Sequence, residues 1–140
     1  MAKVSTRLVP DQNPAKIARL FVQYVKRITP RTVRVKVTEL MGHGTPWLAP
    51  TDHPATQALA RAIQKGFGRK PVYTRTGGTI PVVATLTKLL KTPCLLMGIG
   101  LPDENAHAPN EKLDLDNLHH GMLASAHLWS ELAEAKLGKS

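Results

Sequence analysis

The feature that most constrains the fold is an alternation, after residue 45, between helix-forming stretches and short apolar runs. Helices are predicted over three ranges, 54–67, 80–90 and 115–135. Short strands are predicted between them, at 71–75 and 93–98. This alternation is typical of a layered α/β domain. About two strands are too few to form a sheet alone, so this region is expected to rely on further structure. The last helix carries one apolar stripe, formed by Leu118, Met122, Ala126, Trp129 and Ala133.

The first 40 residues show another order, a strand, a helix and a second strand. Residues 3–9 and 32–40 alternate between apolar and polar side chains with the period of two that is typical of a strand. Between them, Asn13 and Pro14 predict a helix start, apolar residues follow at helical spacing, and Pro30 ends the element. One helix on one face of such a unit buries little apolar surface, so this unit too is expected to pack against further structure.

Length and composition exclude several classes of protein. With 140 residues and 42% hydrophobic content, the chain can bury a core and is too apolar for a disordered tail. Its apolar runs are all shorter than the roughly 20 residues of a membrane-spanning helix. The first residues lack the apolar stretch of a signal peptide, so a cytoplasmic location is expected. The single cysteine, Cys94, lies in an apolar run and cannot form an internal disulfide.

A formal net charge of +9 suggests nucleic-acid binding as one interpretation. The Lys and Arg residues are spread along the chain without a run of five or six like charges, and two Trp, two Tyr and two Phe offer few stacking platforms. A solvated basic surface is therefore favoured, and neither a nucleic acid nor a membrane is expected as a partner. Strongly salt-dependent binding to DNA or RNA would revive the alternative.

His107 is the leading candidate for chemistry, because it follows a short apolar run and two glycines. The run, Pro93–Gly98, predicts a buried strand that delivers the histidine to a loop beyond its carboxyl end, where ligands collect in open α/β sheets. Three nearby acids suit a metal-ligand role: Asp103, Glu104 and Glu111. Zinc takes about three or four protein groups, however, and no second His or Cys stands at zinc spacing. An ordinary loop histidine is the alternative, and this segment predicts no complete metal site.

A second candidate is the turn Gly77-Gly78-Thr79, which precedes a predicted helix. Two glycines there allow close backbone approach, and free amide groups favour an anion, with the Thr79 hydroxyl as a helix cap or a ligand contact. A tight turn with an ordinary N-cap is the alternative and is far more common. His43, between two glycines, and Arg7, whose planar guanidinium suits a carboxylate, complete the candidates.

Four sequence blocks, taken in order, are more specific than any one of these residues. They are Arg7-Leu8-Val9-Pro10, Met41-Gly42-His43-Gly44 with Pro46-Trp47, Arg75-Thr76-Gly77-Gly78-Thr79-Ile80-Pro81-Val82, and Ala106-His107-Ala108-Pro109-Asn110-Glu111-Lys112-Leu113. With these blocks the chain resembles the C-terminal part of the two-metal dipeptidases that include cytosolic non-specific dipeptidase and carnosinase. Their wider family holds acetylornithine deacetylase and succinyl-diaminopimelate desuccinylase. The resemblance covers nearly all of the 140 residues.

The resemblance implies a domain organisation. The enzymes of that family have a catalytic α/β domain interrupted by an inserted, ferredoxin-like lid that dimerises. Residues 1–44 are then expected to be the second half of the lid, with its strand, helix and strand. Residues 45–140 are expected to be the closing segment of the layered α/β catalytic domain.

The resemblance also implies a hydrolase, a metallopeptidase in which a metal-activated water attacks an amide carbonyl. The histidine that matches His107 ligates one of two metals, usually zinc or manganese. Residues matching Arg7, His43 and the turn Gly77 to Thr79 line the pocket for the peptide's carboxylate and carbonyl. Thr79 replaces the usual serine of that turn and adds a methyl group. Thr76 stands where close relatives often have Glu, which removes a charge beside the site.

The larger departure from the family is what this sequence lacks. The other metal ligands, the general-base glutamate and a lid histidine that reaches across the dimer lie upstream in the family and have no match here. We therefore expect the chain to be inactive alone, and to act as a homodimer through the lid or with a missing N-terminal half. The alternative is a non-catalytic dimerisation or interaction module derived from such an enzyme.

Overall fold

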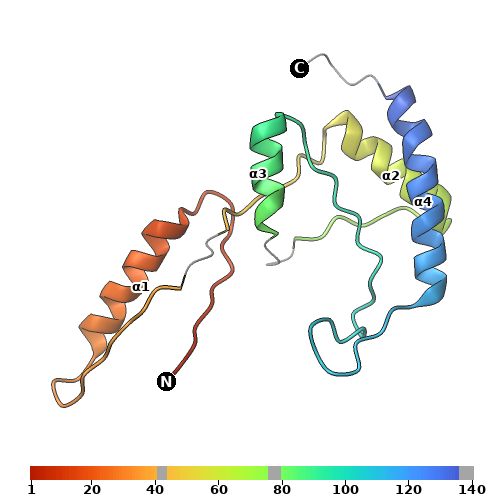
Figure 1. The fold of residues 1–140 in the computed structure, drawn as a ribbon. Coiled ribbons are helices and arrows are strands. Elements are labelled where there is room, and N and C mark those ends of the chain that lie inside the picture. Colours follow the sequence, from red (N-terminus) through yellow and green to blue (C-terminus); the bar gives the residue numbers. More distant parts are fainter. Residues whose placement is uncertain (41–43, 76–79, 136–140) are drawn as a thin grey trace. The chain divides into compact units, whose positions relative to one another are not determined.

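The structure is a computed structural model that describes residues 1–40, 44–75 and 80–135, and the regular elements in these ranges are helices (Figure 1). In chain order they are α1 (Pro14–Ile28), α2 (Pro54–Phe67), α3 (Pro81–Leu90) and α4 (Leu115–Glu134). The chain divides into two compact units. Unit 1 comprises Met1–Leu48 and Arg75–Thr92 and holds α1 and α3. Unit 2 comprises Ala49–Thr74 and Pro93–Ser140 and holds α2 and α4.

The helix starts follow local signals in the sequence. Three helices are capped by the side chain just before them, Asn13 for α1, His53 for α2 and Asp114 for α4. Each cap accepts a hydrogen bond from a backbone amide two or three residues further on, at 3.0, 3.1 and 2.8 Å respectively. This satisfies one of the amides that a helix start leaves unpaired. The predicted helices are confirmed to within a residue of their expected ends.

The predicted Thr79 cap lies outside the described residues. The N-cap position of α3 is Ile80, which makes no side-chain capping hydrogen bond. A proline occupies the first turn of α3, as it does in α1 and α2, where its missing N–H group would have had no partner in the helix.

The core of unit 2 is the antiparallel pair α2 and α4, which lie side by side in Figure 1. Small residues form the contact, since Ala58, Ala62 and Ala124 are fully buried. At Gly66 a Cβ atom would lie only 2.6 Å from the backbone nitrogen of Ala124, so this position has no room for a side chain. The two helices therefore approach closely enough for their backbones to touch.

The apolar stripe along α4 is not its buried face. The buried residues of α4 are Gly121, Ala124 and Glu131. Two members of the predicted stripe, Met122 and Trp129, are 63% and 77% exposed. A sequence pattern identifies the hydrophobic side chains of a helix. A close contact between two helices needs small side chains instead.

Unit 1 has a much smaller core. Among its described residues, Val83 on α3 is the one hydrophobic residue that is buried. The amphipathic α1 carries exposed apolar side chains, namely Leu20, Phe21, Tyr24 and Ile28. With so little buried apolar surface, unit 1 has a smaller contribution to its folding free energy from hydrophobic burial than unit 2.

The described residues contain no strand, including the segments 3–9, 32–40, 71–75 and 93–98 where strands are predicted. Alternation gives a segment two different faces, but a strand also needs a hydrogen-bonded neighbour. The helix expected in the first 40 residues is confirmed. Its assignment to a lid, the two strands beside it, and the division into residues 1–44 and 45–140 stay predictions. None of the described helices combines the length and apolar character needed to cross a bilayer.

Candidate functional site

The loop that carries His107 runs from Leu101 to the start of α4. A turn begins it, with the Glu104 amide donating to the Leu101 carbonyl at 3.2 Å. A second turn holds the histidine itself, since the Ala108 amide donates to the Asn105 carbonyl at 2.9 Å. His107 therefore lies inside a hydrogen-bonded turn.

The two ends of this loop are joined at its base. The Lys112 amide donates to the Glu104 carbonyl at 3.0 Å, and the Lys112 Nζ lies 2.6 Å from an oxygen of Asp103. This contact lowers the pKa of the Asp103 carboxyl and raises the pKa of Lys112. The Glu104 carboxylate accepts a longer hydrogen bond, 3.5 Å, from the Asp114 amide at the start of α4. The base of the loop is thus tied both to itself and to the helix.

The backbone of the loop is left-handed at three residues, Asn105, His107 and Asn110, with φ values of 54°, 65° and 60°. Asn and His are among the residues that adopt this conformation most readily after glycine. The His107 side chain is exposed, and it makes no hydrogen bond or ion pair with the described residues. Its imidazole is available to a ligand from outside the unit.

The acids near His107 do not assemble a metal site with it. Within residues 1–40, 44–75 and 80–135, no three His, Cys, Asp or Glu side chains come together in a way that could hold a metal ion. Asp103 is engaged by Lys112, and Glu104 faces the start of α4. One imidazole is fewer than the three protein ligands of a catalytic zinc. The described residues therefore do not fit a complete metal centre.

The other predicted site residues are only partly visible. Arg7 is exposed in an irregular segment of unit 1, and its guanidinium pairs with none of the described carboxylates. His43, Gly77, Gly78 and Thr79 lie outside the described residues. The described part of the chain therefore does not test whether these five residues meet His107.

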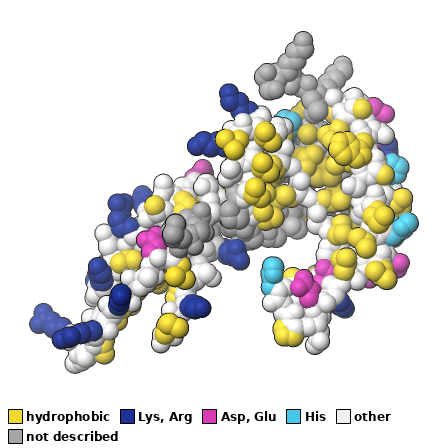
Figure 2. Space-filling view, in the orientation of Figure 1, with side chains coloured by type: hydrophobic (Ala, Val, Ile, Leu, Met, Phe, Trp, Pro, Cys, Tyr) yellow, Lys and Arg dark blue, Asp and Glu magenta, His cyan; other side chains and the backbone are white. Residues whose placement is uncertain are grey.

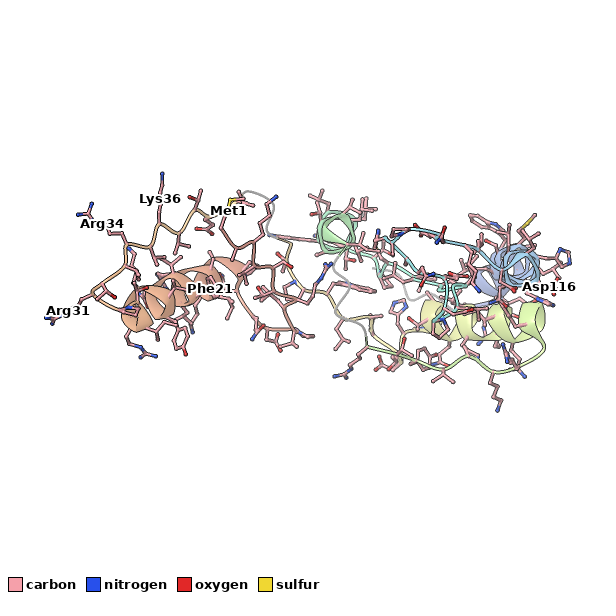
Figure 3. The ribbon with its side chains drawn as sticks, turned by 90° about the horizontal axis from the view of Figure 1, so that it is seen from below. Met1, Phe21, Arg31, Arg34, Lys36 and Asp116 are labelled. Atoms are coloured by element: carbon pink, nitrogen blue, oxygen red, sulfur yellow. The ribbon has the colours of Figure 1, made fainter. Side chains whose placement is uncertain are left out.

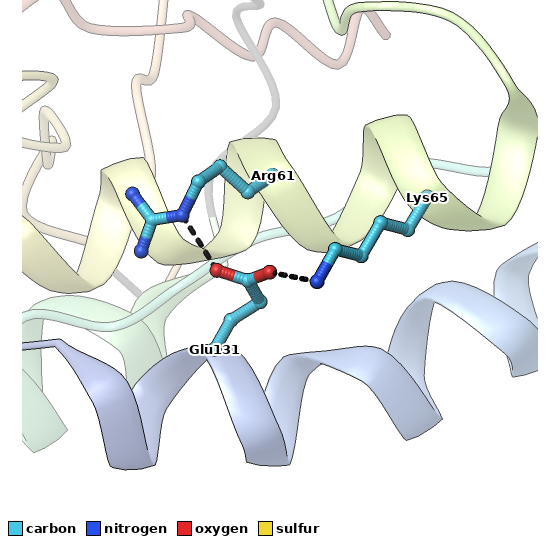
Figure 4. Close-up of polar contacts among 3 residues, drawn as sticks. All are labelled: Arg61, Lys65 and Glu131. Atoms are coloured by element: carbon cyan, nitrogen blue, oxygen red, sulfur yellow. Dashed lines mark hydrogen bonds and ion pairs between the residues drawn. The ribbon is translucent and has the colours of Figure 1, made fainter.

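The sequence analysis missed a charged cluster between α2 and α4, shown in Figure 4. The Glu131 side chain is 3% exposed, and its two oxygens lie 2.5 Å from Arg61 Nε and 2.6 Å from Lys65 Nζ. Hydrogen bonds from Lys65 and Arg61 lower the pKa of Glu131, against the effect of its burial, and the same contact raises the pKa of Lys65. The cluster joins the two helices. Its signal in the sequence is that Glu131 follows Ala124 by seven residues and so lies on the same helix face.

The chain matches known proteins along most of its length. It matches Peptidase family M20/M25/M40 over residues 5–131. It is 32% identical over 124 residues to the Cys-Gly metallodipeptidase of Schizosaccharomyces pombe, covering 87% of this chain and 26% of that protein. It is 29% identical over 136 residues to the Beta-Ala-His dipeptidase of Homo sapiens, covering 96% of this chain and 27% of that protein.

Solved structures show the same likeness. The dipeptidase Dug1p from Saccharomyces cerevisiae superimposes with a TM-score of 0.75 at 30% identity, covering 91% of this chain and 27% of that one. Human carnosine dipeptidase 1 superimposes with a TM-score of 0.74 at 27% identity, with the same coverage. The chain thus spans about a quarter of the length of the relatives that it matches. By sequence and by fold, it belongs to peptidase family M20/M25/M40.

Proposed function

We propose that this chain is a portion of a metal-dependent peptidase that hydrolyses dipeptides or related amide bonds in the cytoplasm. The observation that carries the proposal is the family match over residues 5–131, with relatives whose names describe them as dipeptidases. The structure adds a loop that is tied at its base and offers an exposed imidazole at His107.

In this proposal His107 is a ligand to zinc or manganese. A bound metal of this kind polarises a carbonyl and activates a water. The neutral imidazole is the form of histidine that ligates a metal, and the turn around His107 would fix its direction. Because the described residues offer one ligand, the remaining ligands and the general base would come from outside this chain, which would be inactive alone.

The remaining site residues have proposed roles in substrate binding. Arg7 would bind the carboxylate of the dipeptide through its two-pronged guanidinium. His43 would contact the region of the scissile carbonyl. The turn Gly77-Gly78-Thr79 would present backbone amides and a hydroxyl to the same ligand.

A second candidate is a non-catalytic interaction module that forms a homodimer or binds the N-terminal part of such an enzyme. Exposed apolar side chains on the predicted lid strands favour it, since Val4, Val33 and Val35 are 64%, 53% and 48% exposed. Unpaired strand segments with apolar side chains are ready to pair with another chain. Subunit association without metal binding would favour this candidate over the first.

The peptidase proposal can be tested with a chimera. Residues 5–131 would replace the aligned quarter of the Schizosaccharomyces pombe metallodipeptidase, and hydrolysis of Cys-Gly would be measured with added zinc or manganese. We expect activity in the chimera and none in the 140-residue chain alone. Substitution of His107 by Ala should lower kcat/KM at least about 100-fold. Losing a residue that hydrogen-bonds to a metal ligand typically costs about 10- to 100-fold, and losing the ligand itself should cost more.

His119→Ala is the matched control, because this histidine is also exposed in unit 2 but lies on α4. It should leave kcat/KM within about twofold of the chimera, as expected for a surface substitution away from the site. Equal losses in the two variants would contradict the role of His107. Turnover by the chain alone that requires His107 would instead show that the site is complete without further segments.

A further inference from the structure

The loop that carries His107 is closed at its base by two contacts, which we call the loop clamp. One is the ion pair between Lys112 Nζ and an oxygen of Asp103, at 2.6 Å. The other is the hydrogen bond from the Lys112 amide to the Glu104 carbonyl, at 3.0 Å. Figure 2 shows a His side chain and acidic side chains together on this loop. The clamp therefore joins the two ends of a short segment that has His107 near its middle.

The backbone inside the clamp needs such a restraint. Asn105, His107 and Asn110 are left-handed, with φ values of 54°, 65° and 60°. A residue other than glycine adopts this conformation at a cost in free energy and keeps it where surrounding contacts enforce it. Among the described residues, the backbone hydrogen bond inside the segment is the one from the Ala108 amide to the Asn105 carbonyl. The conformation of His107 therefore depends largely on the loop clamp.

A second set of contacts anchors the clamp to α4. One oxygen of the Glu104 carboxylate accepts a hydrogen bond from the Asp114 amide at 3.5 Å, and the other lies 2.5 Å from where a Cβ atom on Gly100 would be. The Asn117 side chain, in the first turn of α4, donates to the Ile99 carbonyl at 3.2 Å. All of these residues belong to unit 2. The restraint on the loop is thus supplied by neighbouring segments of this chain.

We propose that Asp103 and Lys112 are positioning residues for His107. Their ion pair holds the left-handed turn in one conformation, so that the imidazole is presented in a fixed direction. The inference rests on the function proposed above, in which His107 belongs to the active site. Asp103 and Lys112 act through His107, because a site loses rate when one of its groups must first be ordered.

The exposure of the pair limits the size of the effect. The side chains of Lys112 and Asp103 are 59% and 66% exposed, and such a pair changes a local equilibrium by a factor of about two to five. Salt screens it. The expected loss is therefore modest and depends on charge, unlike the loss of about 100-fold or more expected when His107 itself is removed.

The first measurement is the solvent exchange rate of the Ala108 amide in the full 140-residue chain, followed by NMR at low salt. This amide donates a hydrogen bond inside the loop, so it exchanges when the loop opens. Asp103→Asn should raise its exchange rate about two- to fivefold. The charge-swapped double variant, Asp103→Lys with Lys112→Asp, should return the rate close to that of the wild type.

Asp116→Asn is the matched control, because it removes the same charge from unit 2. Figure 3 shows Asp116 on α4 rather than on the loop, and its carboxylate forms no ion pair with the described residues. The exchange rate of Ala108 should stay that of the wild type in this variant. An equal rise in Asp116→Asn, no rise in Asp103→Asn, or a swapped variant that stays fast would overturn the clamp.

The same substitutions in the chimera described above test the positioning role. Asp103→Asn should lower kcat about two- to fivefold with little change in KM, and the charge-swapped variant should recover. The difference from the wild type should shrink in about 0.5 M NaCl. A faster-exchanging loop with an unchanged kcat would overturn the positioning role. A chimera without turnover would overturn the proposed function and this role with it, whereas the exchange rates would still decide whether the clamp restrains the loop.

Discussion

Glu131 is the residue at which the two helices of unit 2 are joined electrostatically. Its carboxylate is 3% exposed and receives Arg61 on one oxygen and Lys65 on the other (Figure 4). A buried carboxylate is stable only when its oxygens are engaged, and removing its partners leaves an uncompensated charge. Both cations come from one helix and the acid from the other, so the pairing also selects the register of α2 against α4.

This pairing predicts a loss of stability in acid. The folded state lowers the pKa of Glu131, so its contribution is present above the usual Glu pKa of about 4.3 and is lost as the pH falls through the lower, folded value. We expect Glu131→Gln to be less stable than the wild type at neutral pH and to show a flatter decline below pH of about 4.3. Urea unfolding midpoints across this pH range measure both effects.

Glu111→Gln is the control for this experiment, because Glu111 is an exposed acid of the same unit. Its stability should follow the wild type at every pH. If the unfolding midpoint of Glu131→Gln fell with pH in the same way as that of the wild type, other acids would produce the acid dependence. Asp103 beside Lys112 is one such acid.

At the scale of elements, helix ends were predictable and helix faces were not. The caps Asn13 and Asp114 act within three residues, so a sequence pattern is enough to locate them. The buried face of α4 depends instead on how closely α2 approaches, which is a property of two segments about 60 residues apart. The predicted strands at 3–9 and 32–40 depend on pairing partners in the same way.

The close approach of α2 and α4 makes Gly66 intolerant of even one methyl group. Ala is a better helix former than Gly by about 1 kcal/mol, which alone would stabilise α2. The added Cβ would lie 2.6 Å from the Ala124 backbone nitrogen, however, and backbone cannot move aside cheaply. We expect Gly66→Ala to be destabilised by about 1–3 kcal/mol, as in other overpacked contacts. Urea unfolding followed by circular dichroism measures it.

Ser125→Ala on the exposed side of α4 is the corresponding control, and its stability should stay within about 0.5 kcal/mol of the wild type. If Gly66→Ala proved more stable than the wild type, helix propensity would dominate at this position. The two helices would then not be in backbone contact.

At the scale of the whole molecule, the sequence predicted the family better than it predicted the assembled site. The four motif blocks are local, so they identify the family without any three-dimensional information, and the match over residues 5–131 confirms it. The site is different, because Arg7 belongs to unit 1 and His107 to unit 2. Bringing such residues together is a property of long-range packing, and the chain spans about a quarter of its relatives' length.

Unit 1 holds 12 of the 19 Lys and Arg residues of the chain, and this distribution determines where trypsin would first cut the protein. Trypsin cuts after Lys and Arg in exposed, irregular backbone far faster than in a packed helix, which must first open. Arg61 and Lys65 lie in α2 and are paired with Glu131, whereas Arg31, Arg34 and Lys36 follow α1 in an exposed segment. The first tryptic fragments should therefore include ones that begin at Thr32, Val35 and Val37, as mass spectrometry of a brief digest would detect. Early cuts after Arg61 or Lys65 would contradict this. Unit 1 would be trimmed while the α2 and α4 pair survives as the resistant remnant.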